Sequence, residues 1–382
     1  MGKETGRGKN PSRLTLRILC ANAAGRCQFE GCNKPVFVDV LTLKQFNMSN
    51  VAHIVASDPN GPRGDAVRSH QLSDKLENLM LMCADHHKLI DADENVKEFP
   101  EDRLLQMKAR HEQLIALQCD LIYKEPSEMV FLQSPIKGYL PAKIDAHQCA
   151  EAVMPSKRVI SIRGQRIAVE VEGNYRSTSY WESALKVLER KFILKVSAIL
   201  EEEANAHFSV FPIAPIPLII KLGYMMGDKH RADIFQFSRD RDSWKWCSQE
   251  LTNSFTVKKQ LIRDGVRVAL VISLTDDIAL SRVTDVYDAD VLYIIRANHF
   301  GEDCIKSPED LSAFWHVYQS SCNDIKNKYP QVSEIGVFPA MPVSAAFEVG
   351  RRYMPGVYPS FRIFDEDNGF FETIMIGGKS ND

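Results

Sequence analysis

The pattern of apolar and polar positions changes near residue 120. In the C-terminal part, Val266–Leu274 and Val291–Ile295 are nearly continuous apolar runs, which are typical of strands buried on both faces of a parallel sheet. Glu182–Ile199 and Ser307–Lys328 have the apolar spacing of helices and flank these runs. The alternation of the two patterns predicts an α/β domain with helices layered on a sheet.

The N-terminal part is expected to form a domain of its own. Glu101–Gln118 has apolar residues at helical spacing and would close this domain at about residue 120. Prolines and a glycine cluster after it, which indicates a linker over residues 121–150. The expected domains are therefore residues 1–120 and residues 151–382.

The second domain contains an internal repeat with a shift of 127 positions. Each copy is expected to form a short strand that ends in Phe-Pro, followed by a helix that begins at a proline and stops at a glycine. Two copies predict a duplicated domain with halves at about 151–262 and 263–382. The matching pairs are Phe211 and Phe338, Pro212 and Pro339, Pro215 and Pro342, Gly223 and Gly350, Phe237 and Phe364, and Asp240 and Asp367.

Composition and charge limit the classes to which this protein can belong. The chain has 382 residues, of which 45% are hydrophobic and 25% charged, the mixture of an ordinary globular protein. Its net charge of −3 argues against a basic coat for nucleic acid, so any contact with DNA would be local. No apolar run reaches the ~18 residues of a membrane span, and the polar, basic N-terminus shows no secretory signal. We expect no membrane partner.

Cysteine and histidine residues cluster before residue 112 at the spacing of metal ligands. Cys27 and Cys32 form a C-x4-C pair, and Cys83 and His86 form a C-x2-H pair. Two such pairs can converge on one tetrahedral zinc ion, and a site closed by four protein ligands is structural. The nine cysteines of a chain without an export signal also favour reduced thiols over disulfides.

A second set of side chains beside these pairs has the chemistry of phosphodiester hydrolysis. His87 and Asp91, four residues apart on an expected helix, share one face and could hold magnesium or another hard divalent ion. His53 would be the general base that deprotonates a water molecule. Asn78 would orient His53 through its amide oxygen.

Together these motifs resemble those of an HNH endonuclease with a ββα-metal core. The resemblance rests on Cys27-x4-Cys32, Ala52-His53, Asn78, Cys83-x2-His86-His87 and Asp91. It implies an α+β, zinc-stabilised nuclease domain that cleaves double-stranded DNA with one divalent ion, and catalytic roles for His53, Asn78 and His87. Many members of the family have a metal ligand at the position of Ala52, so the ion would have fewer protein ligands or take a substitute such as Asp39.

An insertion after the base histidine offers candidate contacts to DNA. Residues 57–64 are rich in glycine and proline and contain Arg63, with Arg68 shortly beyond. Arg63 could contact a phosphate, and the alternative interpretation is an ordinary surface loop.

The repeated segments of the second domain, 211–217 and 337–344, resemble the SAVED domain. That family looks like two fused CRISPR-associated Rossmann-like (CARF-like) sensor units, so an α/β duplicated fold is implied, with a cyclic oligonucleotide as activating ligand. An HNH and a SAVED domain in one chain resemble the effector nucleases of cyclic-oligonucleotide-based anti-phage signalling (CBASS), which act by abortive infection. The resemblance implies a bacterial cytoplasmic location, a cyclic di- or trinucleotide messenger and a ligand-induced homo-oligomer.

Four residues are candidates for the messenger pocket. Pro215 and Ser344 lie where the repeat would present helix N-termini, whose backbone N–H groups can bind phosphates. Tyr175 and Trp246 have aromatic faces on which bases could stack.

Two other functions remain open from the sequence. The first is an ungated restriction-type HNH nuclease whose second domain recognises DNA, although residues 121–382 carry 31 basic against 34 acidic side chains. The second is a non-catalytic, zinc-stabilised binding module, which the combination of His53, Asn78, His87 and Asp91 argues against.

Overall fold

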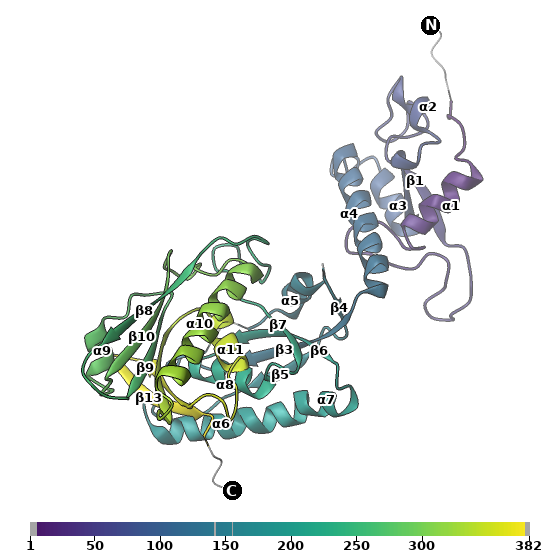
Figure 1. The fold of residues 1–382 in the computed structure, drawn as a ribbon. Coiled ribbons are helices and arrows are strands. Elements are labelled where there is room, and N and C mark those ends of the chain that lie inside the picture. Colours follow the sequence, from purple (N-terminus) through teal and green to yellow (C-terminus); the bar gives the residue numbers. More distant parts are fainter. Residues whose placement is uncertain (1–5, 141–142, 155, 379–382) are drawn as a thin grey trace. The chain divides into compact units, whose positions relative to one another are not determined.

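The structure is a computed structural model that describes residues 6–140, 143–154 and 156–378. The chain divides into two compact units, Met1–Tyr123 and Lys124–Asp382 (Figure 1). Each unit has its own hydrophobic core. None of the helices in the described ranges is long and apolar enough to cross a lipid bilayer.

The first unit is built on a small antiparallel sheet and the helix that follows it. β1 (Ser49–His53) pairs with β2 (Leu79–Cys83), and α3 (Ala84–Asp91) begins directly after β2. All five residues of β2 are buried, which anchors this ββα motif in the core. The ββα architecture expected for the nuclease domain is confirmed. The other elements of the unit are α1 (Arg13–Asn22), α2 (Arg68–Leu72), η1 (Leu76–Asn78), α4 (Glu101–Asp120) and η2 (Leu121–Tyr123).

The second unit contains two sheets, and the first of them is parallel throughout. β3 lies inside this sheet, between β4 or β5 on one side and β6 on the other. The interior positions of β3 are buried apolar and polar residues, so part of the segment expected to be a linker is a core strand. The strands are β3 (Pro126–Gln133), β4 (Arg158–Val159), β5 (Gln165–Ala168), β6 (His207–Ile213) and β7 (Arg231–Ile234).

The second sheet has the order β13-β12-β11-β9-β10-β8 and is parallel except at its edges. β9 and β10 confirm the two strands expected from continuous apolar runs. β13 is antiparallel because Asn368 and Gly369, with φ of 54° and 104°, form a tight hairpin turn after β12. The strands are β8 (Phe255–Leu261), β9 (Val268–Ser273), β10 (Val291–Ala297), β11 (Glu334–Ala340), β12 (Ser360–Glu366) and β13 (Phe370–Ile376).

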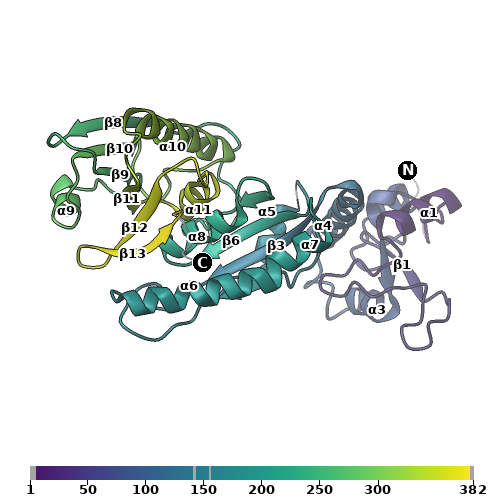
Figure 2. The same cartoon turned by 60° about the horizontal axis from the view of Figure 1, so that its bottom comes forward.

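Helices pack on both sheets, as the alternating pattern predicted. α6, the π-helical turn η3 and α7 form one continuous helical stretch that lies along the first sheet (Figure 2). The Ser307 hydroxyl accepts a hydrogen bond from the backbone of Asp310 and starts α10. The helices are α5 (Ala146–Val153), α6 (Thr178–Phe192), η3 (Ile193–Ser197), α7 (Ala198–Glu202), α8 (Ile216–Met226), α9 (Leu280–Thr284), α10 (Pro308–Lys328) and α11 (Val343–Arg351).

The internal repeat is a repeat of structure. Residues 207–213 of β6 and 334–340 of β11 are separated by the same 127 positions, and each strand leads through a proline into a helix, α8 or α11. The two sheets divide between Ile234 and Phe255, earlier than the expected boundary near residue 262, because β8 pairs with β10 of the second sheet.

The sequence predicts that the repeated glycines end the two helices, and this prediction is wrong. Gly223 lies inside α8 and Gly350 lies in the last turn of α11, where the two helices pack against each other. A Cβ atom on Gly223 would lie 2.1 Å from the carbonyl oxygen of Phe347, and one on Gly350 would lie 1.8 Å from that of Ile220. The glycines therefore permit the close backbone approach that joins the two halves.

Candidate active site and metal centre

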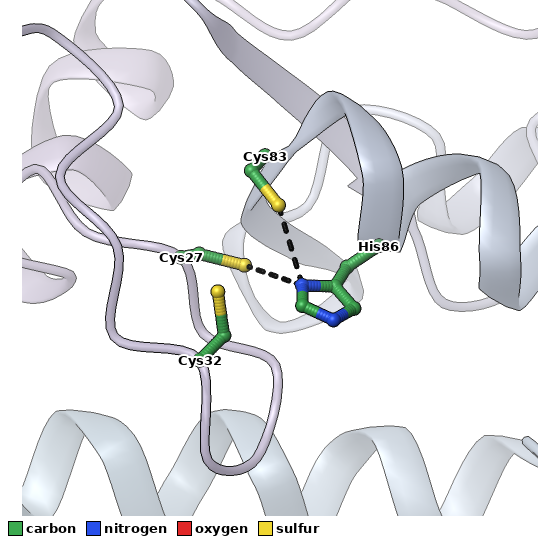
Figure 3. A group of neighbouring side chains, drawn as sticks. All are labelled: Cys27, Cys32, Cys83 and His86. Atoms are coloured by element: carbon green, nitrogen blue, oxygen red, sulfur yellow. Dashed lines mark hydrogen bonds between the residues drawn. The ribbon is translucent and has the colours of Figure 1, made fainter. Parts of the chain in front are cut away.

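Four predicted zinc ligands converge in the first unit. The ligand atoms of Cys27, Cys32, Cys83 and His86 all lie within 4.8 Å of one another (Figure 3). His86 Nδ1 lies 3.3 Å from Cys83 Sγ and 3.8 Å from Cys27 Sγ. Zinc with usual bond lengths and tetrahedral angles separates sulfur and nitrogen ligands by about 3.6 Å. The donor set and its spacing fit a zinc ion.

Local structure explains why these side chains meet. Cys83 is the last residue of β2 and the N-cap of α3, so His86 follows in the first helical turn. Gly31, with φ of 79°, lets the loop between the other two ligands turn sharply. The ring of Phe29 stacks on that of His86 with centroids 4.1 Å apart and restrains its orientation.

The thiols of this cluster are chemically suited to a cation. Burial, together with smaller contributions from the neighbouring Cys83 and Cys32 thiols, raises the pKa of the Cys27 thiol to about 12. Buried thiols of this kind stay protonated unless a positive ion compensates the thiolate charge. Zinc binding here would therefore release protons and contribute to folding.

His53 lies at the end of β1, and its ring is oriented by a backbone carbonyl. Its Nε2 lies 3.0 Å from the carbonyl oxygen of Ser73. Because a carbonyl oxygen only accepts hydrogen bonds, Nε2 carries the proton and Nδ1 is the basic nitrogen. This arrangement suits a general base. The sequence held no signal for Ser73, since any residue can supply a carbonyl group.

Asn78 does not orient His53 as expected. Its Oδ1 accepts a hydrogen bond of 2.8 Å from the Val55 N–H, and its Nδ2 donates to the carbonyl oxygens of Val55 and Leu72 at 2.9 and 3.2 Å. The side chain is buried, so its polar atoms must find backbone partners. Asn78 thus fixes the backbone just beyond His53.

His87 and Asp91 share one face of α3, as their spacing predicted. His87 Nε2 lies 3.5 Å from Asp91 Oδ2, and the other carboxylate oxygen, Oδ1, accepts a hydrogen bond of 2.7 Å from Arg63 Nη2. An imidazole and one carboxylate oxygen therefore face each other, and they could hold a divalent ion whose remaining ligands are water. His87 follows His86 directly, so α3 carries residues of both candidate metal sites.

Arg63 is not an exposed contact for DNA, which corrects the interpretation of its loop. Its side chain is only 6% exposed. Besides Asp91, it donates hydrogen bonds of 2.7 Å to the carbonyl oxygens of Ile54 and Ile90. Arg63 therefore ties the strand end after His53 to the end of α3.

The remaining candidates of the first unit lie at its surface or in its core. Arg68 is 47% exposed and pairs with both carboxylate oxygens of Glu101. Asp39 accepts two hydrogen bonds of 2.8 Å from Thr42 within its own turn, which lower the pKa of its carboxyl. Ala52 is fully buried in the core. Thus Asp39 is engaged in local structure, and Arg68 can still face a phosphate.

Most of the candidates for the messenger pocket are core residues. Tyr175 is buried, its hydroxyl donates to Asp365, and its ring packs on Trp181 with centroids 5.1 Å apart. Ser344 is fully buried and its hydroxyl donates to Gln236 Oε1 at 2.7 Å.

Pro215 is buried at the start of α8. Of the four candidates, only Trp246 is partly exposed, and it lines a cavity of about 700 Å³. The sequence pattern could not distinguish a pocket residue from a core residue, because an aromatic side chain that stacks on a base and one that packs in a core are of the same type.

Two family models match the chain. Residues 27–94 match the HNH endonuclease model, and residues 192–376 match the model described as SMODS-associated and fused to various effectors sensor domain (SAVED). No curated protein matches the sequence.

Among solved structures, the Cap4 SAVED/CARF-domain containing receptors are similar in fold. The Acinetobacter baumannii receptor with the cyclic trinucleotide 3'3'3'-cAAA has 13% identity and a TM-score of 0.43, over 74% of this chain and 61% of that chain. The same receptor with the cyclic trinucleotide 2'3'3'-cAAA has 12% identity and a TM-score of 0.45, over 74% of this chain and 62% of that chain. The Moraxella osloensis receptor has 12% identity and a TM-score of 0.40, over 74% of this chain and 60% of that chain.

This chain thus spans about three fifths of the length of those receptors, and at these TM-scores the likeness carries no functional assignment. The domain assignment rests instead on the family models, and it agrees with the ββα motif and the duplicated α/β unit. The chain therefore joins an HNH endonuclease domain to a SAVED sensor domain.

Proposed function

We propose that this protein is a DNA endonuclease that a cyclic oligonucleotide switches on, acting in the bacterial cytoplasm as a CBASS-type effector against phage. The observation that carries the nuclease activity is the contact of His53 with the Ser73 carbonyl, which leaves Nδ1 as the base. The presence of a SAVED domain in the same chain supports control by a nucleotide messenger.

The proposed reaction is the hydrolysis of one phosphodiester bond. His53 Nδ1 takes a proton from water, the water oxygen bonds to phosphorus, and the bond from phosphorus to the leaving oxygen breaks. His87 and Asp91 Oδ2 would hold a divalent ion such as magnesium, whose charge stabilises the phosphate and the leaving oxygen. Arg63 restrains the Asp91 carboxylate, and Asn78 restrains the backbone after His53.

The Cys27, Cys32, Cys83 and His86 cluster would bind a structural zinc ion. It holds the start of α3, and therefore positions His87 and Asp91 relative to His53. The sensor family that matches the second unit and its slightly acidic charge balance argue against a DNA-reading role.

A plasmid-cleavage assay tests the proposal. The full chain is incubated with supercoiled plasmid, magnesium and a panel of cyclic di- and trinucleotides, next to His53→Ala and a surface control, His147→Ala. We expect cleavage by the parental chain and by the control only with one class of messenger, and none by His53→Ala. Equal cleavage without messenger would indicate an ungated nuclease, and parental rates for His53→Ala would refute the assignment of the base.

A further inference from the structure

The N-terminal segment of the first unit is basic, in contrast to the chain as a whole. Residues 6–29 contain five lysine and arginine residues and no aspartate or glutamate, whereas the full chain has 47 basic and 50 acidic residues. Charge separation of this kind within one short stretch is typical of a surface that binds a polyanion. The exposed cations of the segment, called the basic strip below, are Arg7, Lys9, Arg13 and Arg17.

The basic strip has no acidic partner within the part of the chain that the structure describes. The exposed Arg68 of the same unit, by contrast, is paired with Glu101. Arg13 and Arg17 are four residues apart on α1, so two like charges share one face of the helix. Such a pair destabilises a helix slightly. The strip therefore keeps its full positive charge for a ligand.

The first part of the strip is fixed to the segment that follows the proposed base. The Gly8 N–H donates a hydrogen bond of 2.8 Å to the carbonyl oxygen of Ser57. Nε2 of His70, in α2, lies 2.8 Å from the carbonyl oxygen of Gly6. The chain thus runs beside α2 before it enters α1 (Figure 1). These contacts distinguish the segment from a free tail.

Gly8 packs directly on the residue that supports the base. A Cβ atom on Gly8 would lie 2.5 Å from Ser73 Oγ and 2.6 Å from Ser73 Cβ, so no larger residue fits there. The carbonyl oxygen of the same Ser73 lies 3.0 Å from His53 Nε2. Because Gly8 faces Ser73, its exposed neighbours Arg7 and Lys9 lie next to the support of the base.

We propose that the basic strip binds the phosphate backbone of the DNA duplex and holds the duplex at the nuclease site. The inference rests on the proposed function, because it takes DNA as the ligand. Lysine and arginine side chains that neutralise phosphates release the counterions of the duplex, and this release supplies binding free energy. Contacts to phosphates position a duplex without reading its sequence. The strip thus supplies a local positive field to a chain whose net charge is −3.

An anionic lipid surface is the competing ligand, because α1 also exposes Leu14 at 66% and Ile18 at 39%. The contact of Gly8 with Ser73 favours DNA, since it places the strip beside the side chain proposed to act on a phosphodiester.

Fluorescence anisotropy with the full chain and a labelled DNA duplex tests the strip. Binding is measured without added magnesium, so that the duplex is not cleaved, and at salt concentrations from about 50 to 200 mM. The measurements are made alone and with each cyclic nucleotide of the plasmid-cleavage panel. Thermal melting verifies that every variant is folded.

The variants are two pairs of substitutions in the strip and one matched pair outside it. The control cations are exposed and four residues apart on α6, as Arg13 and Arg17 are on α1. The three double variants are Arg7→Gln with Lys9→Gln, Arg13→Gln with Arg17→Gln, and the control Lys186→Gln with Arg190→Gln.

Each double variant of the strip should remove two phosphate contacts. We expect the slope of log Kd against log salt concentration to become less steep by about 2, and Kd at low salt to rise about ten-fold or more. The control should change Kd less than about two-fold, because its cations lie outside the nuclease domain.

Gly8→Ala keeps all four charges but forces the segment away from Ser73. It should raise Kd about three-fold or more, whereas a flexible basic tail would bind as before. An unchanged Kd in this variant would overturn the fixed position of the strip.

Parental slopes in both double variants would overturn the strip as a DNA site and leave the proposed function intact. Vesicles of phosphatidylglycerol and phosphatidylcholine are tested in parallel. Loss of vesicle binding with unchanged DNA binding in the double variants would overturn DNA in favour of a lipid surface. Failure of the parental chain to bind the duplex under any of these conditions would overturn both the strip and the proposed DNA substrate.

Discussion

Single residues in the nuclease domain act through contacts to backbone atoms that lie far away in the sequence. Ser73 supplies a carbonyl group to His53, and Asn78 satisfies the backbone of Val55. Arg63 bridges the ends of β1 and α3 with three hydrogen bonds of 2.7 Å. These contacts restrain His53, the proposed base, and Asp91, the proposed metal ligand.

Arg63→Met should destabilise the first unit and reduce cleavage. The change leaves two carbonyl oxygens and Asp91 Oδ1 without the donor that Arg63 supplies, which costs about 2–4 kcal/mol. Hydrogen exchange of residues 1–123 in the full chain measures the stability, and plasmid cleavage measures the activity. We expect at least a ten-fold loss of rate.

Arg68→Met is the matched control for the exchange measurement, because its ion pair with Glu101 is exposed and contributes about 1 kcal/mol or less. If Arg63→Met weakens DNA binding but leaves exchange unchanged, its role is contact with DNA after all.

At the scale of elements, α3 carries residues of two proposed metal sites that differ in chemistry. His86 completes a thiolate-rich set, and His87 with Asp91 offers nitrogen and oxygen ligands one turn apart. Soft thiolates favour zinc, whereas carboxylates with water favour hard ions such as magnesium.

Asp91→Ala should lose cleavage and keep one zinc ion per chain, since Asp91 is outside the thiolate set. Cys83→Ala should lose both cleavage and zinc, because structural zinc would supply folding energy to the first unit. Elemental analysis and plasmid cleavage on the same preparations check this division. Loss of zinc from a folded Asp91→Ala variant would show that the ligands are assigned to the wrong sites.

The two duplicated halves are joined where α8 packs against α11. Gly350→Ala would place a methyl group 1.8 Å from the Ile220 carbonyl oxygen, and the two helices must separate to accept it. Overpacking of this kind costs about 1–3 kcal/mol and occasionally more. We expect a lower melting temperature and weaker messenger binding.

Ser320→Ala, on an exposed position of α10, provides the comparison and should melt as the parental chain does. An unchanged melting temperature for Gly350→Ala would mean that the close approach is unimportant for stability.

At the scale of the whole molecule, we propose that the messenger controls the nuclease by assembling several chains. A shift from 1% to 99% active requires about 5.5 kcal/mol of differential binding. Association of chains around bound ligand can add to this energy, and it brings together nuclease sites for both DNA strands.

Cleavage should then rise steeply with protein concentration, and only with messenger present. Multi-angle light scattering and plasmid cleavage on the same samples should show oligomers and activity appearing together. Messenger-bound monomers with full activity would contradict assembly, and ligand-free monomers with full activity would contradict gating altogether.

The sequence by itself determined the parts of this protein that depend on local spacing. Cys27, Cys32, Cys83 and His86 have ligand spacing on turns, and the structure brings them together. The apolar runs predicted β9 and β10, and the shift of 127 positions predicted β6 and β11 as equivalent strands. Each of these features is recognised from residues that are close together in the sequence, so it can be predicted without knowledge of the fold.

Only the tertiary structure decided what polar and aromatic side chains contact. Arg63 was interpreted as exposed, yet its partners come from the ends of β1 and α3. Tyr175 resembled a stacking platform, but its partner Asp365 lies 190 positions away. Gly223 and Gly350 resembled helix stops until their backbones were seen in contact. Burial and hydrogen bonding join residues that are distant along the chain, and a pattern of residue types does not contain those pairings.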